Sequence, residues 1–296
     1  MSAAGEASVT DTTSGARDAW RRLRKNRMAV ACLSLFAAIV VFCLLGPLVA
    51  GWLGIDAAAQ NVRLGATPPS ARHWMGTDPL GRDLLVRTMD GGRIAITIAL
   101  LATSVALLIG VTWGATSGWV GGRLDEAMMR FVDVMYALPS TVFVIVIMAV
   151  LGTRSIFLLF ALIGGINWLT MARLVRGQVL SLKHREFVEA ARGLGVRTPR
   201  LLARHIVPNA LGPIIVYATL SVPAVMLQEA FLSFLGLGVQ APRASWGTLI
   251  AEGAQQIVVY PWILVGPGLV MSLTIFALNF LGDGLRDALD PHTRKV

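Results

Sequence analysis

Apolar residues along this chain are gathered in six stretches of 18 to 30 residues that contain no Asp, Glu, Lys or Arg. A helix needs about 20 apolar residues to cross the hydrocarbon core of a membrane. We therefore predict six membrane-spanning helices, with cores at 28–50, 94–117, 135–152, 156–172, 211–234 and 262–281. The pattern predicts an all-α integral membrane protein in which a five-helix core, 94–281, follows a first span.

The segments between the spans differ in positive charge, which predicts their sidedness. With the N-terminus in the cytoplasm, the inside segments carry 19 Lys and Arg residues and the outside segments carry seven. Positive residues gather on the cytoplasmic side of membrane proteins. We therefore expect a cytoplasmic N-terminal segment 1–27, a cytoplasmic loop 173–212 and a cytoplasmic tail 282–296, with 51–93 and 237–260 outside.

The N-terminal segment ends in a basic run, and residues 18–27 read DAWRRLRKNR. We interpret this run as a short amphipathic helix in which Trp20 and Leu23 dip into the membrane interface while arginines meet lipid headgroups. A simpler interpretation, which is compatible with the first, is that these positive residues only mark the end of the first span. The apolar run that follows is too long for the core of a cleaved signal peptide.

The outside segment 51–93 is irregular in its first part and organised in its second. Asp78 precedes a proline and is predicted to cap a short surface helix. Asp83 and Arg87 are four residues apart and would pair on that helix. The glycines at 91–92 are expected to end it before the second span. Two interpretations of this short helix stay open: it lies on the membrane surface, or a partner protein docks on it.

The largest cytoplasmic loop, 173–212, is predicted to form a helix–turn–helix below the membrane. Its first helix covers 183–194 and ends at Gly195, since glycine readily takes the left-handed conformation that closes a helix. A second short helix begins at Thr198, where a cap is followed by proline. Pro208 is expected to break the chain before the fifth span.

Composition agrees with a membrane protein. Hydrophobic residues make up 55% of the chain, charged residues 15%, and the mean hydropathy is +0.67. The net charge of +9 is explained by residues facing anionic lipid, so no nucleic-acid partner is inferred. Cys32 and Cys43 are too far apart on one helix to form a disulfide. Phosphate-binding, zinc-protease and serine-hydrolase motifs are missing from the sequence, so we predict no catalytic residue, metal or cofactor in this chain.

Glu229 is the one acidic residue placed within a predicted span, toward its outer end. We consider two roles for it: a hydrogen-bond anchor between helices and a group that lines a transport pathway. An ion-coupled carrier acting alone would need more intramembrane charge and an internal repeat. The sequence has neither, so energy for uphill transport is expected to come from another subunit.

The stretch FVEAARGLGVRTPRLLARHIVPNALGP at 187–213 resembles the EAA loop of permeases from binding-protein-dependent ABC importers. The pattern EAA, three residues, Gly, nine residues and a stretch ending in Pro fits without a gap, with His205 where isoleucine is usual. Three further stretches resemble the C-type permease subunit of dipeptide, oligopeptide and nickel transporters. They are MGTDPLGRDLLVR at 75–87, LSFLGLGVQAPRASWGTLI at 232–250 and LGDGLRDALDP at 281–291.

The resemblance implies a type I ABC importer permease fold in a bacterial cytoplasmic membrane. It implies a homologous second permease, two ATPase subunits that bind ATP and Mg²⁺, and an extracytoplasmic substrate-binding protein as partners. The cargo would be a di- or oligopeptide, with nickel or another small solute as the alternative. The ATPases would dock on residues of the EAA loop, namely Phe187, Glu189, Ala190, Ala191, Gly195 and Pro208.

Overall fold

The computed structural model describes residues 12–52, 54–152 and 155–289, and within these the regular elements are helices, joined by irregular loops such as 54–83, with one isolated β-bridge. Among the residues that the structure describes, five helices are long and apolar enough to cross a membrane, or six spans result if the bent pair α4 and α5 counts as one. The helices are α1 (Thr12–Lys25), α2 (Arg27–Trp52), α3 (Leu84–Val120), α4 (Gly122–Ala137), α5 (Ser140–Leu151), α6 (Ile156–Leu182), α7 (Glu186–Gly193), α8 (Thr198–Leu201), α9 (Val207–Phe234), α10 (Trp246–Ala254) and α11 (Trp262–Leu289).

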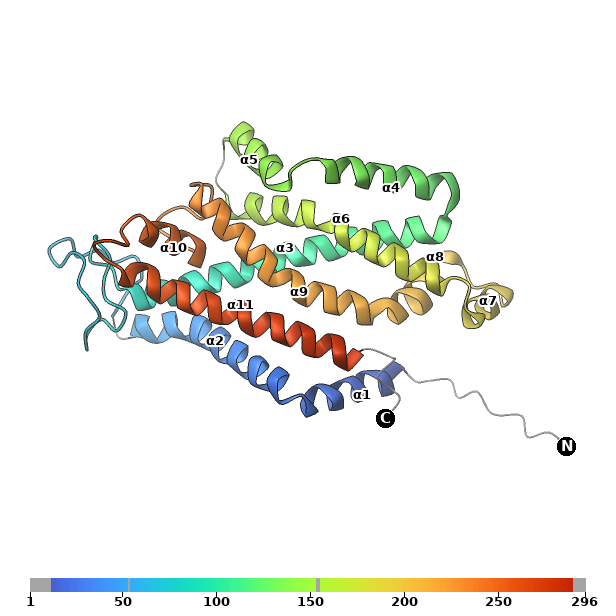
Figure 1. Cartoon of the computed structure of the whole chain (residues 1–296), viewed down its shortest axis with the longest axis horizontal. Coiled ribbons are helices and arrows are strands. Elements are labelled where there is room, and N and C mark those ends of the chain that lie inside the picture. The colour runs from blue at the N-terminus through green and yellow to red at the C-terminus, as the bar shows by residue number, and fades with distance from the viewer. Residues whose placement is uncertain (1–11, 53, 153–154, 290–296) are drawn as a thin grey trace.

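The long helices α2, α3, α6, α9 and α11 run side by side along the longest axis of the molecule (Figure 1). One end of this bundle carries the loop between α2 and α3 together with α10. The opposite end carries α7, α8, α1 and the last turns of α11. The segments predicted to be outside and those predicted to be cytoplasmic thus separate to opposite ends of the bundle.

Glycines allow α3 and α6 to pack closely, and they lie every four residues on α3 at 110, 114 and 118. A Cβ atom at Gly110 would lie 2.6 Å from Met171 Cβ, and one at Gly118 would lie 2.9 Å from the Arg176 carbonyl oxygen. The same closeness is seen from α6: a Cβ added at Gly164 would lie 2.6 Å from the Ala102 carbonyl oxygen of α3. Small residues at such spacing let membrane helices approach backbone to backbone.

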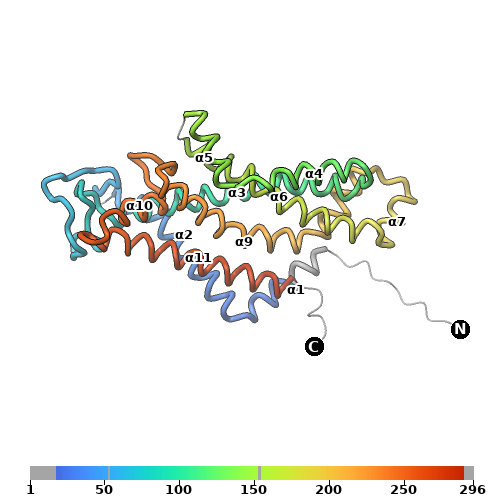
Figure 2. The backbone as a smooth tube through the Cα atoms, turned by 45° about the horizontal axis from the view of Figure 1, so that its top comes forward, coloured from blue at the N-terminus to red at the C-terminus, as the bar shows by residue number. Residues whose placement is uncertain are grey.

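The third predicted span, 135–152, is not one straight helix. The structure has α4 and α5 bent by 81° at a break between them. Leu138 takes an extended conformation there, as the residue before Pro139 is expected to do because the proline ring crowds a helical one. The 12 residues of α5 rise only about 18 Å, less than the hydrocarbon thickness. It stands away from the bundle in a second view (Figure 2).

The predicted surface helix at Asp78 is wrong. Asp78 lies in a turn, where its Oδ1 accepts from the Leu80 and Arg82 N–H groups and its Oδ2 accepts from the Arg82 and Arg87 side chains. The helix begins instead at Leu84 and is capped by Asp83, whose side chain accepts from the Val86 N–H.

Two related expectations are also wrong. The glycines at 91–92 do not stop the helix, because α3 continues to Val120. Gly92 serves close packing, since a Cβ there would overlap Trp246 of α10 and Cys43 of α2. Arg87 pairs with Asp78 and with Glu252 of α10 rather than with Asp83. The side chain of Asp83 pairs instead with His73 at 2.8 Å.

The N-terminal helix is longer than the predicted 18–27 and begins at Thr12. Leu23 does not dip into lipid, because it is 5% exposed and packs with Ala29, Leu285 and Ala288. Trp20 remains half-exposed, with the Arg24 guanidinium 5.9 Å from its ring centroid. This helix is therefore attached to the end of α11 by its apolar side.

Candidate coupling site

The predicted EAA segment forms a helical corner between α6 and α9. The chain leaves α6 at Leu182, turns through 183–185 and enters α7 at Glu186, three residues later than expected. Helix α7 ends in a paired hydrogen-bond arrangement: Val196 N–H donates to the Ala191 carbonyl and Gly195 N–H donates to the Arg192 carbonyl. This is a Schellman ending, which needs a left-handed residue. Gly195 supplies it with φ of +76°, as predicted.

Pro208 does not break the chain. Residues Leu202–Ile206 form a π-helical turn that connects α8 to α9, and the helix continues through Pro208 without interruption. The Val207 N–H donates to the carbonyl of Leu202, five residues earlier. A wider turn moves the preceding carbonyls away from the proline ring, and proline has no N–H that would need a partner. The proline is accommodated at the start of α9.

One side of α7 is buried in the protein itself. Val188 is fully buried and Ala191 is 7% exposed, and both pack with Leu201 and Ile206 from the same corner and with Val179 of α6. Ala191 was expected to be one of the residues on which the ATPases dock. Docking on Ala191 stays a prediction, and in this structure Val188 and Ala191 hold α7 onto the bundle.

The adjoining side of α7 exposes apolar residues. Phe187 is 41% exposed and Leu194 is 86% exposed, with Ala190 exposed between them. Their spacing of three and four residues places them on one face of the helix. We call Phe187, Ala190 and Leu194 the α7 ridge. Leu194 was missed in the sequence, although its spacing from Ala190 and Phe187 was a signal that could have identified it.

Charged residues border this ridge. Glu189 is exposed, and within the part of the chain that the structure describes it forms no ion pair with Arg185 or Arg192. The Arg192 guanidinium instead lies over the Trp119 ring at the end of α3, 4.1 Å from the centroid. Glu189 is therefore available to a cation on another protein.

At the end of the bundle that carries α7, an ion pair ties three helices together. Arg176 of α6 donates two hydrogen bonds to Asp125 of α4, at 2.6 and 2.7 Å, and Ser117 of α3 donates a further one to the same carboxylate. Lys183 donates to the carbonyl of Gly118. Because these bonds are charge-assisted and partly buried, they make a firm base for α7.

Glu229 lies near the C-terminal end of α9 and is 2% exposed. Its Oε1 accepts hydrogen bonds from Ser233 of α9 at 2.8 Å and from Ser245, the N-cap of α10, at 2.6 Å. Gly247 leaves room for the carboxylate, since a Cβ there would lie 2.7 Å from Oε2. These contacts are those of an anchor between α9 and α10. A pathway role for Glu229 stays a prediction.

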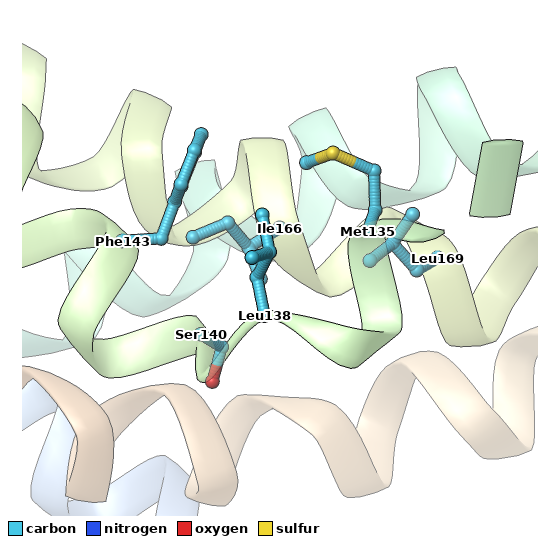
Figure 3. A pocket seen from close by; sticks show the side chains of 6 residues that line it. All are labelled: Met135, Leu138, Ser140, Phe143, Ile166 and Leu169. Carbon is cyan, nitrogen blue, oxygen red and sulfur yellow. The ribbon is translucent and has the colours of Figure 1, made fainter. Parts of the chain in front are cut away.

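A small cavity at the joint between α4 and α5 is lined by side chains of α4, α5 and α6 (Figure 3). Its volume is about 10 Å³, and the lining residues are Met135, Leu138, Ser140, Phe143, Ile166 and Leu169. That space holds at most one water molecule, and none of the site residues predicted from the sequence lines it.

The predicted site residues do not come together. The coupling residues lie at one end of the bundle, and Glu229 lies near the other.

Two family descriptions match parts of this chain. Residues 106–295 match the family described as binding-protein-dependent transport system inner membrane component. Residues 14–69 match the N-terminal transmembrane domain of oligopeptide transport permease C.

Individual relatives match over most of their length. The chain is 47% identical to the oligopeptide transport system permease protein OppC of Bacillus subtilis, covering 94% of this chain and 90% of the relative. It is 44% identical to the dipeptide transport system permease protein DppC of the same organism, covering 94% and 86%. The MetNI methionine ABC transporter, in an inward-facing conformation, has a similar fold with a TM-score of 0.56 at 15% identity, covering 69% of this chain and 96% of that one.

Proposed function

This chain belongs to the family of inner membrane components of binding-protein-dependent transport systems, and on that premise we propose that it forms half of a translocation pathway for di- or oligopeptides. It is a permease subunit of an ABC importer and a multi-pass protein of the cytoplasmic membrane. Family membership decides against an ion-coupled carrier acting alone. The names of the relatives support a peptide cargo, since they are oligopeptide and dipeptide permeases.

The proposal for coupling rests on the α7 ridge, which we propose as the surface where an ATPase subunit docks. It exposes Phe187 and Leu194 at the end of the molecule that is predicted to be cytoplasmic, beside the exposed Glu189. Exposed apolar side chains rimmed by charge are typical of protein–protein contacts. The ridge would fit an apolar groove on an ATPase subunit that binds ATP and Mg²⁺, with a basic residue of that subunit meeting Glu189.

Movement of a docked ATPase would be transmitted through the buried side of α7. Val188 and Ala191 pack against α6, α8 and the π-helical turn, and Arg192 contacts the end of α3. Since α3 and α6 are packed backbone to backbone, they would move as one body. ATP-driven closure of two ATPases would in this way rock this permease against a homologous second permease, with the binding protein at the opposite end.

Two substitutions at Gly195 and two at exposed leucines test this proposal. A Cβ at Gly195 meets no atom within 4 Å, so Gly195→Ala adds only the strain of positive φ, about 1 kcal/mol. Gly195→Arg adds bulk beside the ridge. Leu194→Ala removes an exposed ridge side chain, and Leu45→Ala, on the exposed side of α2, is its matched control.

The measurement is co-purification of the ATPase subunits with each variant, followed by uptake of a labelled dipeptide. Gly195→Arg and Leu194→Ala should lose ATPase binding and uptake, while Gly195→Ala and Leu45→Ala retain most of both. If Gly195→Arg and Leu194→Ala kept both activities, α7 would not be the coupling element. If ATPase binding were lost as expected but wild-type complex took up no di- or oligopeptide, the cargo proposal alone would fail.

A further inference from the structure

Two amide side chains, Asn167 of α6 and Gln228 of α9, meet between helices that are long and apolar enough to cross a membrane. Asn167 Nδ2 donates to the Ile163 carbonyl and to Gln228 Oε1, each at 3.0 Å. The Ile163 carbonyl can only accept, so it decides which end of the Asn167 amide carries the NH₂ group. These two bonds use both hydrogens of that group.

This arrangement leaves one edge of the amide pair without a partner. Within the part of the chain that the structure describes, Asn167 Oδ1 accepts no hydrogen bond and Gln228 Nε2 donates none. The fully buried side-chain atoms without a partner in that part are Thr103 Oγ1, Trp113 Nε1 and Gln256 Oε1. Because Asn167 Oδ1 and Gln228 Nε2 are not among them, both atoms reach the surface of this chain.

The depth of the pair argues against an edge that faces lipid. Asn167 lies 11 residues after the start of α6, and Gln228 lies six residues before the end of α9. At 1.5 Å per residue, they are roughly 9–17 Å from those helix ends. Lipid tails at this depth offer no hydrogen-bonding group, and polar side chains there face another helix or a water-filled pathway.

Further polar groups continue from this edge along α6. Thr170 and Arg173 follow Asn167 at intervals of three residues, on the same side of the helix, and both are exposed. The hydroxyls of Thr170 and Tyr136 are hydrogen-bonded, and the Arg173 guanidinium lies 4.1 Å from the Tyr136 ring centroid. Arg173 also donates to Asp133 at 2.6 Å, so its charge is compensated. The row from Asn167 to Arg173 leads toward the end of the bundle that carries α7 (Figure 1).

The free edge is complementary to a peptide bond. A peptide bond has one N–H donor and one carbonyl acceptor, and the edge offers the acceptor Asn167 Oδ1 and the donor Gln228 Nε2. The neighbouring Glu229 is 2% exposed and accepts from Ser233 and Ser245, so it adds no charge at the surface. A neutral edge of this kind recognises a backbone amide whatever side chains the peptide carries.

We propose that Asn167 and Gln228 form a subsite for one backbone amide of a peptide in transit. The peptide N–H donates to Asn167 Oδ1, and the peptide carbonyl accepts from Gln228 Nε2. The row from Asn167 to Arg173 is roughly 9 Å long, close to the length of three extended peptide residues. This subsite rests on the peptide cargo proposed above, and the second permease would cover the other side of the peptide.

The test is uptake by the assembled complex, with its ATPases and binding protein, in proteoliposomes. The substrates are labelled trialanine and its analogue in which esters replace both peptide bonds, which has no amide N–H to donate to Asn167. The binding protein is the same for every variant, so a change in the preference for trialanine between variants comes from this chain. One hydrogen bond contributes roughly two- to tenfold.

Asn167→Leu should therefore lower the preference for trialanine over the ester roughly fivefold, while ATP hydrolysis stays at the wild-type rate. Asn279→Leu removes an exposed amide from another span, α11, and is the matched control. It should keep the wild-type preference.

A second measurement leaves the amide pair intact. A photoreactive phenylalanine derivative replaces Thr170, one turn from Asn167, or Asn279 as the control, and labelled trialanine is supplied with ATP. Illumination during turnover should attach trialanine to the Thr170 variant and not to the Asn279 variant.

Three results would overturn the proposal. An unchanged preference in Asn167→Leu, with trialanine still taken up, would make the amide pair only a link between α6 and α9. A Thr170 adduct with the second permease and none with trialanine would make the edge a contact between subunits. If the wild-type complex took up no trialanine at all, the peptide cargo would fail and the subsite with it.

Discussion

Replacing Gly164 by alanine tests whether α3 and α6 form the rigid pair that transmits movement from α7. The new Cβ would lie 2.6 Å from the Ala102 carbonyl oxygen and 2.8 Å from Val105 Cβ, whereas ordinary contacts begin at 3.4 Å. The two helices would have to separate by about 0.8 Å. Overpacking of this kind costs about 1–3 kcal/mol.

Gly165, the next residue on the same helix, is the matched control. A Cβ there meets nothing within 4 Å, so Gly165→Ala keeps only the helix-propensity gain of about 1 kcal/mol that both substitutions share. The difference between the two variants therefore isolates the contact with α3. We expect Gly164→Ala to be less stable than Gly165→Ala by about 2 kcal/mol.

The assay uses the two native cysteines, which are buried and free, as reporters. A thiol-reactive fluorophore labels them only when the protein unfolds, so a thermal ramp in detergent gives a Tm for each variant. At roughly 2–4 °C per kcal/mol, Gly164→Ala should melt roughly 4–8 °C below Gly165→Ala. Equal Tm values would refute the close α3–α6 contact and, with it, the transmission of movement through that pair.

Three further predictions concern sidedness, the buried acid and a helix cap. In a cysteine-free background, Val258→Cys should react with an impermeant thiol reagent in whole cells, and Leu194→Cys should not; the reverse pattern would invert the topology. Glu229→Gln should keep most transport, because the amide preserves the hydrogen-bonding shape, whereas lost uptake with normal ATPase assembly would favour a pathway role. Asp83→Ala removes the α3 cap and should lower the free energy of unfolding by about 1 kcal/mol in denaturant titrations, and an unchanged midpoint would contradict that role.

The positions of the spans could be predicted because apolar length is a strong local signal. The same signal could not show how far helices extend into water: α3 begins ten residues before its charge-free run, because Asp83 caps it and Arg87 finds acidic partners on other segments. The sequence alone could not show which glycines end a helix and which lie inside one. Gly195 ends a helix, as its position before a new cap indicated, whereas Gly92 lies inside a helix because Trp246 packs against it.

The candidate site could be predicted as a segment but not as a surface. The spacing from Glu189 to Pro208 located the helical corner, and residue type alone could not separate its buried side from its exposed side. Val188 and Leu194 are both apolar, yet one is fully buried and the other almost fully exposed, because the cluster formed with α6 and α9 occupies only one part of the apolar face of α7.

Site-specific photo-crosslinking tests the central claim, that the α7 ridge is where the ATPase subunits dock. A photoreactive phenylalanine derivative would replace Leu194, or Val258 as an equally exposed apolar control at the opposite end of the bundle. In assembled complexes, illumination should join the Leu194 variant to an ATPase subunit and leave the Val258 variant unlinked to it. An assembled, active complex that gives no ATPase adduct from position 194 would contradict the account.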